Sequence, residues 1–473
     1  MAISTGTITR RAFAASFVTT LLAGRAAAQT AGAPTIPEED GFRVLTAAPK
    51  RAKLHPEAPA EAELWAFNGE VPGPVLRVQH GDEARVRLKN RTDKPLSLHW
   101  HGVRIANAMD GAAPLTQMPV LPGKDFDYRF TPPDAGTYIV RPCVIGASAE
   151  AAERGLTALL IVEERERAPV DREIVLLFDD WRLERDGTLS PFGAVPEAAT
   201  TGRLGNFLTV NGRAPPQTVE AAPGSRIRLR LANLCNARAA RLRFDDLKVY
   251  VIGVDGQPTE SFEPLRSTLP FSPGSRYDLL FDGPAEAGAK GAVTALIGPG
   301  VPLLTVTAAG EPASAKRPAL PPVAGLALNP LLPPAIRLQD AVRRDVVIAG
   351  GARRGPGGEP VYDGDPKKIW TVNRAAGDPG AKPLVTVKRG QPVVLAINNT
   401  TPAVQPIHLH GHVFRLLHPF DDGWEPYFLD TLQVPENRTV RIAFVADNPG
   451  KWLLASTVLE RYDTGLWTWF EVI

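Results

Sequence analysis

Apolar and polar residues alternate in short runs along much of the chain, which is the pattern of half-buried β-strands. Residues 84–88 and 227–231 both alternate an apolar side chain with an arginine, and residues 159–162 form a further short apolar run. Turn residues punctuate such runs from residue 40 to 310, and strand signals resume at residues 346–348. With 46 Pro and 42 Gly in the chain, this pattern predicts an all-β protein with many turns.

A weak internal repeat divides the strand pattern into three similar units. Each unit begins with an Asn-containing element, passes a Pro or Gly turn, and continues into a strand that ends in Asn. The three openings are Phe67-Asn68-Gly69, Val210-Asn211-Gly212 and Val372-Asn373-Arg374, and the strands end at Asn90, Asn233 and Asn399. Repeated Greek-key β-barrels would account for this period.

The 473 residues are enough for about three domains of roughly 150 residues each. We therefore predict three Greek-key β-barrel domains at residues 40–165, 170–310 and 340–473. A Pro- and Ala-rich stretch lies within residues 311–339, and its composition predicts a linker between the second and third domains.

Residues 1–28 have the order of features expected of an export signal. Arg10 and Arg11 form a twin-arginine pattern, an apolar stretch follows, and Ala26–Ala28 resembles a cleavage site. The alternative is an amphipathic N-terminal helix. A twin-arginine signal predicts recognition by the twin-arginine export machinery and a location in the periplasm, where a partner protein is conceivable.

Charge and hydropathy narrow the classes of partner. Removal of residues 1–28 takes away three arginines and no acid, so the formal net charge changes from +2 to −1. A near-neutral surface gives no reason to expect nucleic acid as a partner. No later apolar run reaches the ~20 residues that span a bilayer. Cys143 and Cys235 fall in different predicted domains, so we expect two free thiols.

Two clusters hold five of the eight histidines. The first is Leu98-His99-Trp100-His101-Gly102, and the second is Pro406-Ile407-His408-Leu409-His410-Gly411-His412. Residues two apart on a strand face the same side, so each cluster presents a pair of imidazoles. Paired imidazoles suit copper, zinc, iron or nickel. Two such pairs among so few histidines favour a metal site over chance.

These clusters resemble the first and third copper motifs of the multicopper oxidases of the laccase type. The resemblance extends over nearly the whole chain after residue 28, through "NGEVPGPVLRVQHGD", "VIGVDGQP", "FSPGSRYDLLFD" and "NPGKW". It implies cupredoxin-like domains and copper as the cofactor. It also implies that Asp110, in "MDG", corresponds to an acidic residue that serves proton delivery. Capping of the turn before Gly111 is an equal alternative.

The family's other copper motifs are degenerate in this chain. Arg141 and Cys143 stand at the two histidine positions of the second motif. The His-Cys-His of the fourth motif is replaced by Ala455-Ser456-Thr457. A type 1 copper needs a thiolate, two imidazoles and a weak axial ligand. The corresponding residues here are Ser456, Gln405, Arg461 and Leu466, so we predict that the type 1 site is absent.

The type 2 position alone keeps its expected ligands, His99 and His408. His101 and His410 survive from the type 3 set, and Cys143 could add a soft ligand. We therefore predict that His99, His101, His408 and His410 hold one copper ion, or zinc, between the first and third domains. His412 resembles a packing residue.

Two functions follow from this resemblance. In the first, the protein retains a type 2-like metal site and has little or no laccase-type oxidase turnover, because the residues through which the family admits electrons are missing. In the second, it is a copper-free periplasmic scaffold or binding protein, similar to the family member that acts in cell division. Buried imidazoles that face one another need a partner, which favours the first function.

Overall fold

Strands account for nearly all the regular structure in the computed structural model, which describes residues 36–315, 318, 320–419 and 423–473. The all-β prediction is confirmed. The predicted export signal lies outside the described residues. Ala33–Ile473 forms one compact unit. Among the described residues, no helix is long and apolar enough to cross a membrane.

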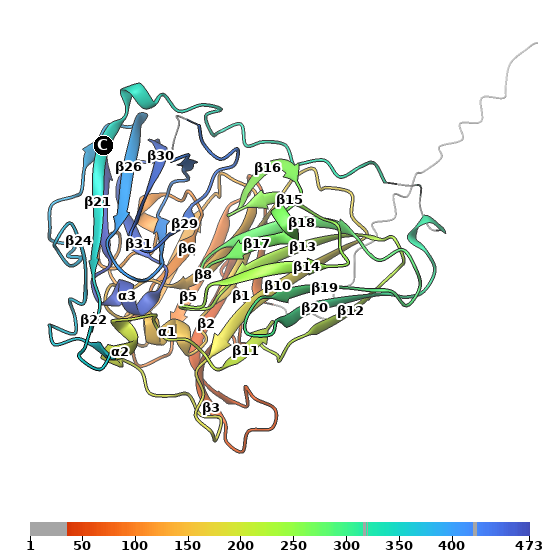
Figure 1. Cartoon of the computed structure of the whole chain (residues 1–473), viewed down its shortest axis with the longest axis horizontal. Coiled ribbons are helices and arrows are strands. Elements are labelled where there is room, and N and C mark those ends of the chain that lie inside the picture. Colours follow the sequence, from red (N-terminus) through yellow and green to blue (C-terminus); the bar gives the residue numbers. More distant parts are fainter. Residues whose placement is uncertain (1–35, 316–317, 319, 420–422) are drawn as a thin grey trace, which may run out of the picture. The chain divides into compact units, whose positions relative to one another are not determined.

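The first set of strands forms two sheets (Figure 1). One has the order β1-β2-β5-β7, with β3 paired to β2, and the other has the order β4-β9-β8-β6. The elements are β1 (Glu38–Glu39), β2 (Phe42–Ala52), β3 (Ala62–Phe67), β4 (Val75–Gln79), β5 (Ala84–Asn90), β6 (Leu98–His101), η1 (Asn107–Met109), β7 (Asp125–Phe130), β8 (Gly136–Pro142), α1 (Ala149–Glu153) and β9 (Ala158–Glu163).

The second set also forms two sheets, with the orders β11-β10-β13-β18-β15-β16 and β12-β20-β19-β14-β17. The elements are β10 (Arg172–Trp181), α2 (Val195–Ala198), β11 (Phe207–Val210), β12 (Gln217–Ala221), β13 (Arg226–Asn233), β14 (Ala240–Asp245), β15 (Val249–Val254), β16 (Gln257–Phe262), η2 (Leu265–Ser267), β17 (Thr268–Phe271), β18 (Arg276–Asp282), β19 (Lys290–Ala295) and β20 (Val301–Ala308).

A connecting segment precedes the third set of strands. Between η3 and η4, whose bounds are given below, its described residues form neither helix nor strand. Its two main sheets have the orders β24-β21-β26-β30-β28 and β25-β32-β31-β27-β29. The elements are η3 (Ala313–Ala315), η4 (Leu338–Asp340), β21 (Val342–Gly350), β22 (Arg353–Arg354), β23 (Pro360–Val361), β24 (Trp370–Val372), β25 (Thr386–Val387), β26 (Gln391–Asn399), β27 (Gln405–Leu409), β28 (Arg415–Leu417), β29 (Thr431–Val434), β30 (Arg438–Ala446), β31 (Gly450–Ser456), α3 (Leu459–Asp463) and β32 (Trp467–Val472). The predicted domain and linker boundaries stay a prediction.

The internal repeat corresponds to one recurring corner of the fold. Asn68, Asn211 and Asn373 all have positive φ, from 49° to 54°. In each case Oδ1 accepts a hydrogen bond from a backbone N–H of the set's long first strand, at 2.8 Å. That strand pairs in parallel with the strand that ends in the second repeated Asn. The repeat is therefore structural, because asparagine tolerates the left-handed conformation and fixes the turn.

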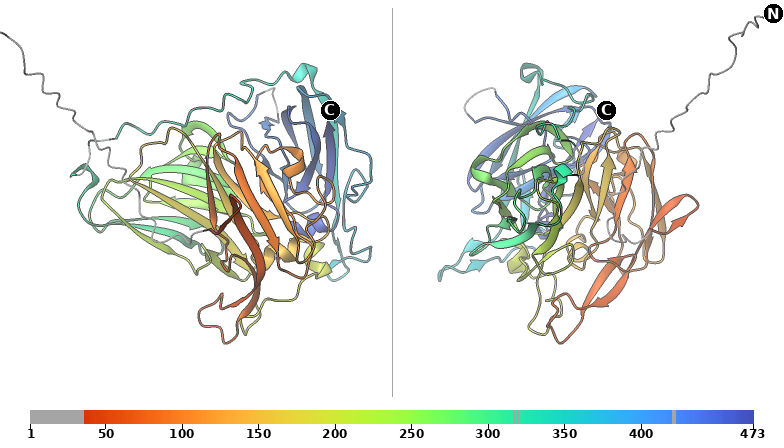
Figure 2. Two further views of the ribbon diagram at one scale, coloured as in Figure 1. Left: turned by 180° about the vertical axis from the view of Figure 1, so that it is seen from behind. Right: turned by 90° about the vertical axis from the view of Figure 1, so that its right-hand side faces the viewer.

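The largest apolar core joins the first and third sets of strands. It includes Trp100 and Tyr138 from the first set and Trp452 from the third, while the second set has its own core around Leu229 and Phe271. Figure 2 shows the orange strands of the first set beside both the green and the blue strands. This shared core brings the two histidine segments together.

Candidate metal centre

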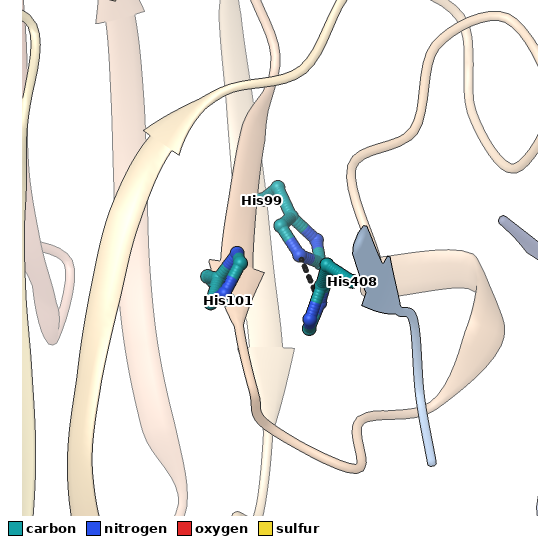
Figure 3. A group of neighbouring side chains, drawn as sticks. All are labelled: His99, His101 and His408. Carbon is teal, nitrogen blue, oxygen red and sulfur yellow. Dashed lines mark hydrogen bonds between the residues drawn. The ribbon is translucent and has the colours of Figure 1, made fainter. Parts of the chain in front are cut away.

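Strands β6 and β27 present the histidine clusters to each other. Nε2 of His99 lies 3.3 Å from Nε2 of His408, although the residues are 309 positions apart (Figure 3). The ring of His101 stacks on that of His408 with centroids 3.7 Å apart, and the ring of His410 stacks on that of His99 at 3.9 Å. None of the four side chains is more than 3% exposed. The structure thus brings together all four histidines singled out in the sequence.

The hydrogen bonds of His99 and His408 fix which nitrogen carries the proton. Nδ1 of His99 lies 3.0 Å from the carbonyl oxygen of Asp110, and Nδ1 of His408 lies 2.9 Å from that of Asp430. A carbonyl oxygen only accepts, so each Nδ1 is the donor. Each Nε2 then carries a lone pair, and these two lone pairs face each other.

Burial favours the neutral form of three of the four imidazoles. It lowers the pKa of His408 to about 4 and that of His410 to about 3, because a charged ring loses its hydration in the interior. The pKa of His101 also falls well below its ordinary value, for the same reason. Neutral imidazoles are the form that binds metal ions.

Asp110 connects the two clusters through its carboxylate. Its side chain is fully buried and lies 3.2 Å from Nδ1 of His99 and 3.1 Å from Nδ1 of His410. Burial opposes ionisation, but the interactions with His410 and His99 outweigh it and hold the pKa of Asp110 well below its ordinary value. The adjacent Gly111 has φ +82°, and a Cβ there would meet the Leu98 carbonyl oxygen at 1.9 Å. Asp110 therefore both stands in a tight turn and orients two histidines.

Sequence reasoning missed Asp430, Thr431 and Arg276. Asp430 is fully buried, and its carboxylate accepts hydrogen bonds from both terminal nitrogens of Arg276, one of them at 3.0 Å. Thr431 pairs with His408 across β27 and β29, and its hydroxyl donates to Asp430 at 2.8 Å. Because that proton is used, Nε2 of His101 must be the donor in its 2.9 Å contact with Thr431 Oγ1. In the sequence, the apolar pair Phe428-Leu429 directly before Asp430 is the one feature that points to a buried carboxylate at this position.

Two of the positions predicted to correspond to type 1 copper ligands, Gln405 and Arg461, are joined by a guanidinium–amide contact. Arg461, 3% exposed, donates from Nη1 to Gln405 Oε1 at 2.7 Å and from Nη2 to the Thr200 carbonyl at 2.8 Å. Ser456 Oγ accepts a hydrogen bond from the backbone N–H of Val458 at 3.1 Å. Gln405 and Arg461 thus hydrogen-bond each other directly, although Nε of Arg461 has no partner among the described residues.

Cys143 and His412 lie outside the imidazole groups. The thiol of Cys143 contacts the Tyr462 hydroxyl at 3.4 Å, and burial raises its pKa to about 12, which disfavours the thiolate that binds metals. In the described part of the chain, the candidate metal groups around the histidines do not include it. His412 packs against Phe444 and Trp452, as expected. Both cysteines are free thiols, which confirms that expectation.

Comparison with known proteins decides the family. Sequence profiles described as multicopper oxidase match residues 49–167, 172–289 and 360–473. Multicopper oxidase MmcO of Mycobacterium tuberculosis is 30% identical over 470 residues, which covers 91% of this chain and 87% of that protein. The chain belongs to the multicopper oxidase family. This confirms the resemblance drawn from the copper motifs and implies copper as the family's metal.

The similar proteins include both a multi-copper oxidase of known structure and a cell division protein. The crystal structure of the multi-copper oxidase from Pseudomonas thermotolerans superimposes with a TM-score of 0.79 at 33% identity, covering 91% of this chain and 98% of that one. This agreement confirms the cupredoxin-like fold. Cell division protein FtsP of Proteus mirabilis is 30% identical over 236 residues, 47% of each protein.

Proposed function

We propose that this multicopper oxidase homologue holds a single type 2-like copper ion, or zinc, between its first and third sets of strands. His99 and His408 would be the ligands through Nε2, with His101 and His410 beside them. Bound there, the metal would supply a cation that coordinates small ligands. Laccase-type turnover would be slight or absent.

The facing lone pairs of His99 and His408 carry this proposal. The two Nε2 atoms are 3.3 Å apart, and their facing lone pairs repel each other unless a cation lies between them. Two ligands of a tetrahedral metal with bonds of about 2.0 Å are themselves about 3.3 Å apart. His101 adds a third nitrogen within 4.8 Å of both. Asp110 and Asp430 orient the rings from behind, as carboxylates and carbonyls do in histidine metal sites.

The surroundings of the type 1 and type 3 positions support the low turnover. The Arg461 guanidinium donates a hydrogen bond to Gln405. A fixed positive charge would therefore stand among the residues that correspond to the family's type 1 copper ligands. Arg141 lies beside His99 in the β6–β8 pairing, so a second cation borders the type 3 positions. Electrons would lack the entry site that oxygen reduction in this family requires.

A copper-free scaffold is the second candidate, and one observation favours it. The hydrogen bonds of His410 with Asp110 and of His101 with Thr431 tie the first and third sets of strands together without any metal. The histidines could therefore persist as structural residues, as in a protein related to the cell-division member. In either case the N-terminal pattern supports twin-arginine export to the periplasm, where a protein partner could bind.

Metal analysis separates the two candidates. The protein would be purified from the periplasm of its own host, without added metal, and its copper and zinc would be quantified by mass spectrometry. About one equivalent of copper or zinc in the wild type, lost in the His99→Ala/His408→Ala double variant, supports the metal site. The control is His55→Ala, which removes an imidazole outside the cluster. A metal-free wild type that also takes up neither ion in dialysis favours the scaffold.

A further inference from the structure

Arg141 stands on the same face of the sheet as the metal-site histidines. It lies in β8, directly opposite His99 of β6, and cross-strand partners project to the same side of a sheet. His99 and His101 are buried, whereas Arg141 is half-buried. Its side chain therefore projects on the same side of the sheet as the ring of His99, and its charge acts on the imidazoles of His101 and His408.

Unlike the buried Arg276 and Arg461, Arg141 has no acceptor among the described residues. Arg276 pairs with Asp430, and Arg461 bonds to Gln405 and two carbonyl oxygens. Arg141 forms neither a hydrogen bond nor a salt bridge with any residue that the structure describes. Burial lowers the pKa of Arg141 to about 10, because the charge has lost hydration without full compensation. Arginines beside buried groups are normally paired, so the half-buried Arg141 lacks a counterpart among the described residues.

Two further polar atoms in the same region have no partner among the described residues. They are Oγ1 of Thr457 and Nδ1 of His101, both fully buried. The residues are neighbours, since a Cβ on Gly274 would lie 3.0 Å from the His101 ring and 3.5 Å from Thr457 Cγ2. Thr457 thus has an unused hydroxyl donor, His101 has an unused lone pair, and Arg141 has an unused guanidinium. The unused donors of Thr457 and Arg141 favour an anion as ligand, and the unused lone pair of His101 favours a cation.

We propose that Arg141 binds a small oxyanion or carboxylate beside the metal-site histidines. The inference rests on the proposed function, because the anion would lie next to the metal ion. A guanidinium offers a planar pair of N–H donors that matches two oxygens of a carboxylate or oxyanion. The buried surroundings restrict the ligand to a compact anion. Arg141 thereby converts a lost histidine position into an anion site.

Calorimetric titration with acetate and with sulfate tests this assignment on copper-loaded and on metal-free full-length protein. We expect Arg141→Gln to weaken binding at least tenfold, Arg141→Lys to weaken it less, and Arg129→Gln, at an exposed arginine of β7, to leave it unchanged. The electron paramagnetic resonance spectrum of bound copper(II) should shift when the anion is added to the wild type but not to Arg141→Gln. Metal content and melting temperature are measured for every variant.

Each outcome decides a different claim. Anion binding that Arg141→Gln leaves intact, or no binding to either form of the wild type, overturns the anion site even where copper is retained. Arg141-dependent binding to protein that takes up no metal supports the anion site and refutes the proposed metal centre. If Arg141→Gln does not fold, Arg141→Lys decides, since it keeps the charge and loses the planar fork; unchanged affinity in that variant contradicts guanidinium recognition.

Discussion

The carboxylate of Asp110 lies 3.1 Å from Nδ1 of His410, a residue 300 positions away. The same carboxylate reaches Nδ1 of His99, so one buried acid orients an imidazole from each of the two histidine clusters. The proton-relay role that the family resemblance implies for Asp110 stays a prediction. The geometry supports a positioning role in addition.

Replacement of Asp110 with Asn should weaken metal binding without abolishing it. The amide can accept only through one oxygen, so one imidazole loses the acceptor that orients it and raises its basicity. Loss of such a contact typically costs about 10–100-fold in metal affinity. Competition titration with a copper(II) chelator measures the change, and Asp125→Asn, at an exposed acid, serves as the control. Equal affinity in Asp110→Asn and wild type would show that the carboxylate does not support the site.

Copper(II) or zinc should raise the melting temperature of the wild type. A ligand that binds only the folded state stabilises it by about 2.7 kcal/mol at a hundredfold excess over Kd. Here the ligands come from two sets of strands, so the ion would also clamp them together. The His99→Ala/His408→Ala variant should fold, because the apolar core between these sets remains, and should show no rise. A wild-type melting curve that neither ion moves would count against the metal centre.

Copper-loaded protein should lack the intense absorption near about 600 nm that a copper–thiolate bond gives at a type 1 site. Ser456 supplies no sulfur, and the Cys143 thiol is held against Tyr462. Visible spectroscopy at one copper per chain measures this directly. A strong band would mean that Cys143 or Cys235 provides the thiolate, and it would contradict the predicted absence of the type 1 site.

Arg461→Ala should destabilise the fold by about 2–4 kcal/mol, since it leaves one buried and two partly buried acceptors without a donor. These acceptors are Gln405 Oε1 and the carbonyl oxygens of Val404 and Thr200. Arg441→Ala, at an exposed position of β30, is the matched control. Chemical denaturation gives both values. A loss no larger than that of the control would show that the Arg461 contacts do not stabilise the region.

The Asp463→Asn variant should have a flatter dependence of stability on pH. Burial raises the pKa of Asp463 to about 7 from its ordinary 3.8, so the folded state holds a proton that the unfolded state releases. The stability that this group contributes is therefore full below about pH 4 and falls as the pH rises to about 7. Over that range the variant should gain about 1–3 kcal/mol relative to wild type. Parallel unfolding curves from pH 4 to 8 measure the difference, and a constant difference would contradict the raised pKa.

The sequence by itself determined the family, the all-β fold and the repeated asparagine corners, because these depend on local pattern. A period of two sets the strands, and asparagine with positive φ sets each corner. It also identified the four clustered histidines, since a His-X-His strand places both rings on one side whatever surrounds it.

Only the tertiary structure decided what those rings face. The 3.3 Å approach of His99 to His408 depends on packing between strands about 300 residues apart, which no local pattern encodes. The same packing places Asp430 behind His408, turns Cys143 towards Tyr462 and leaves Arg141 without an acceptor among the described residues. Such contacts follow from the shared core of the first and third sets of strands, because burial removes water and makes each remaining polar contact decisive.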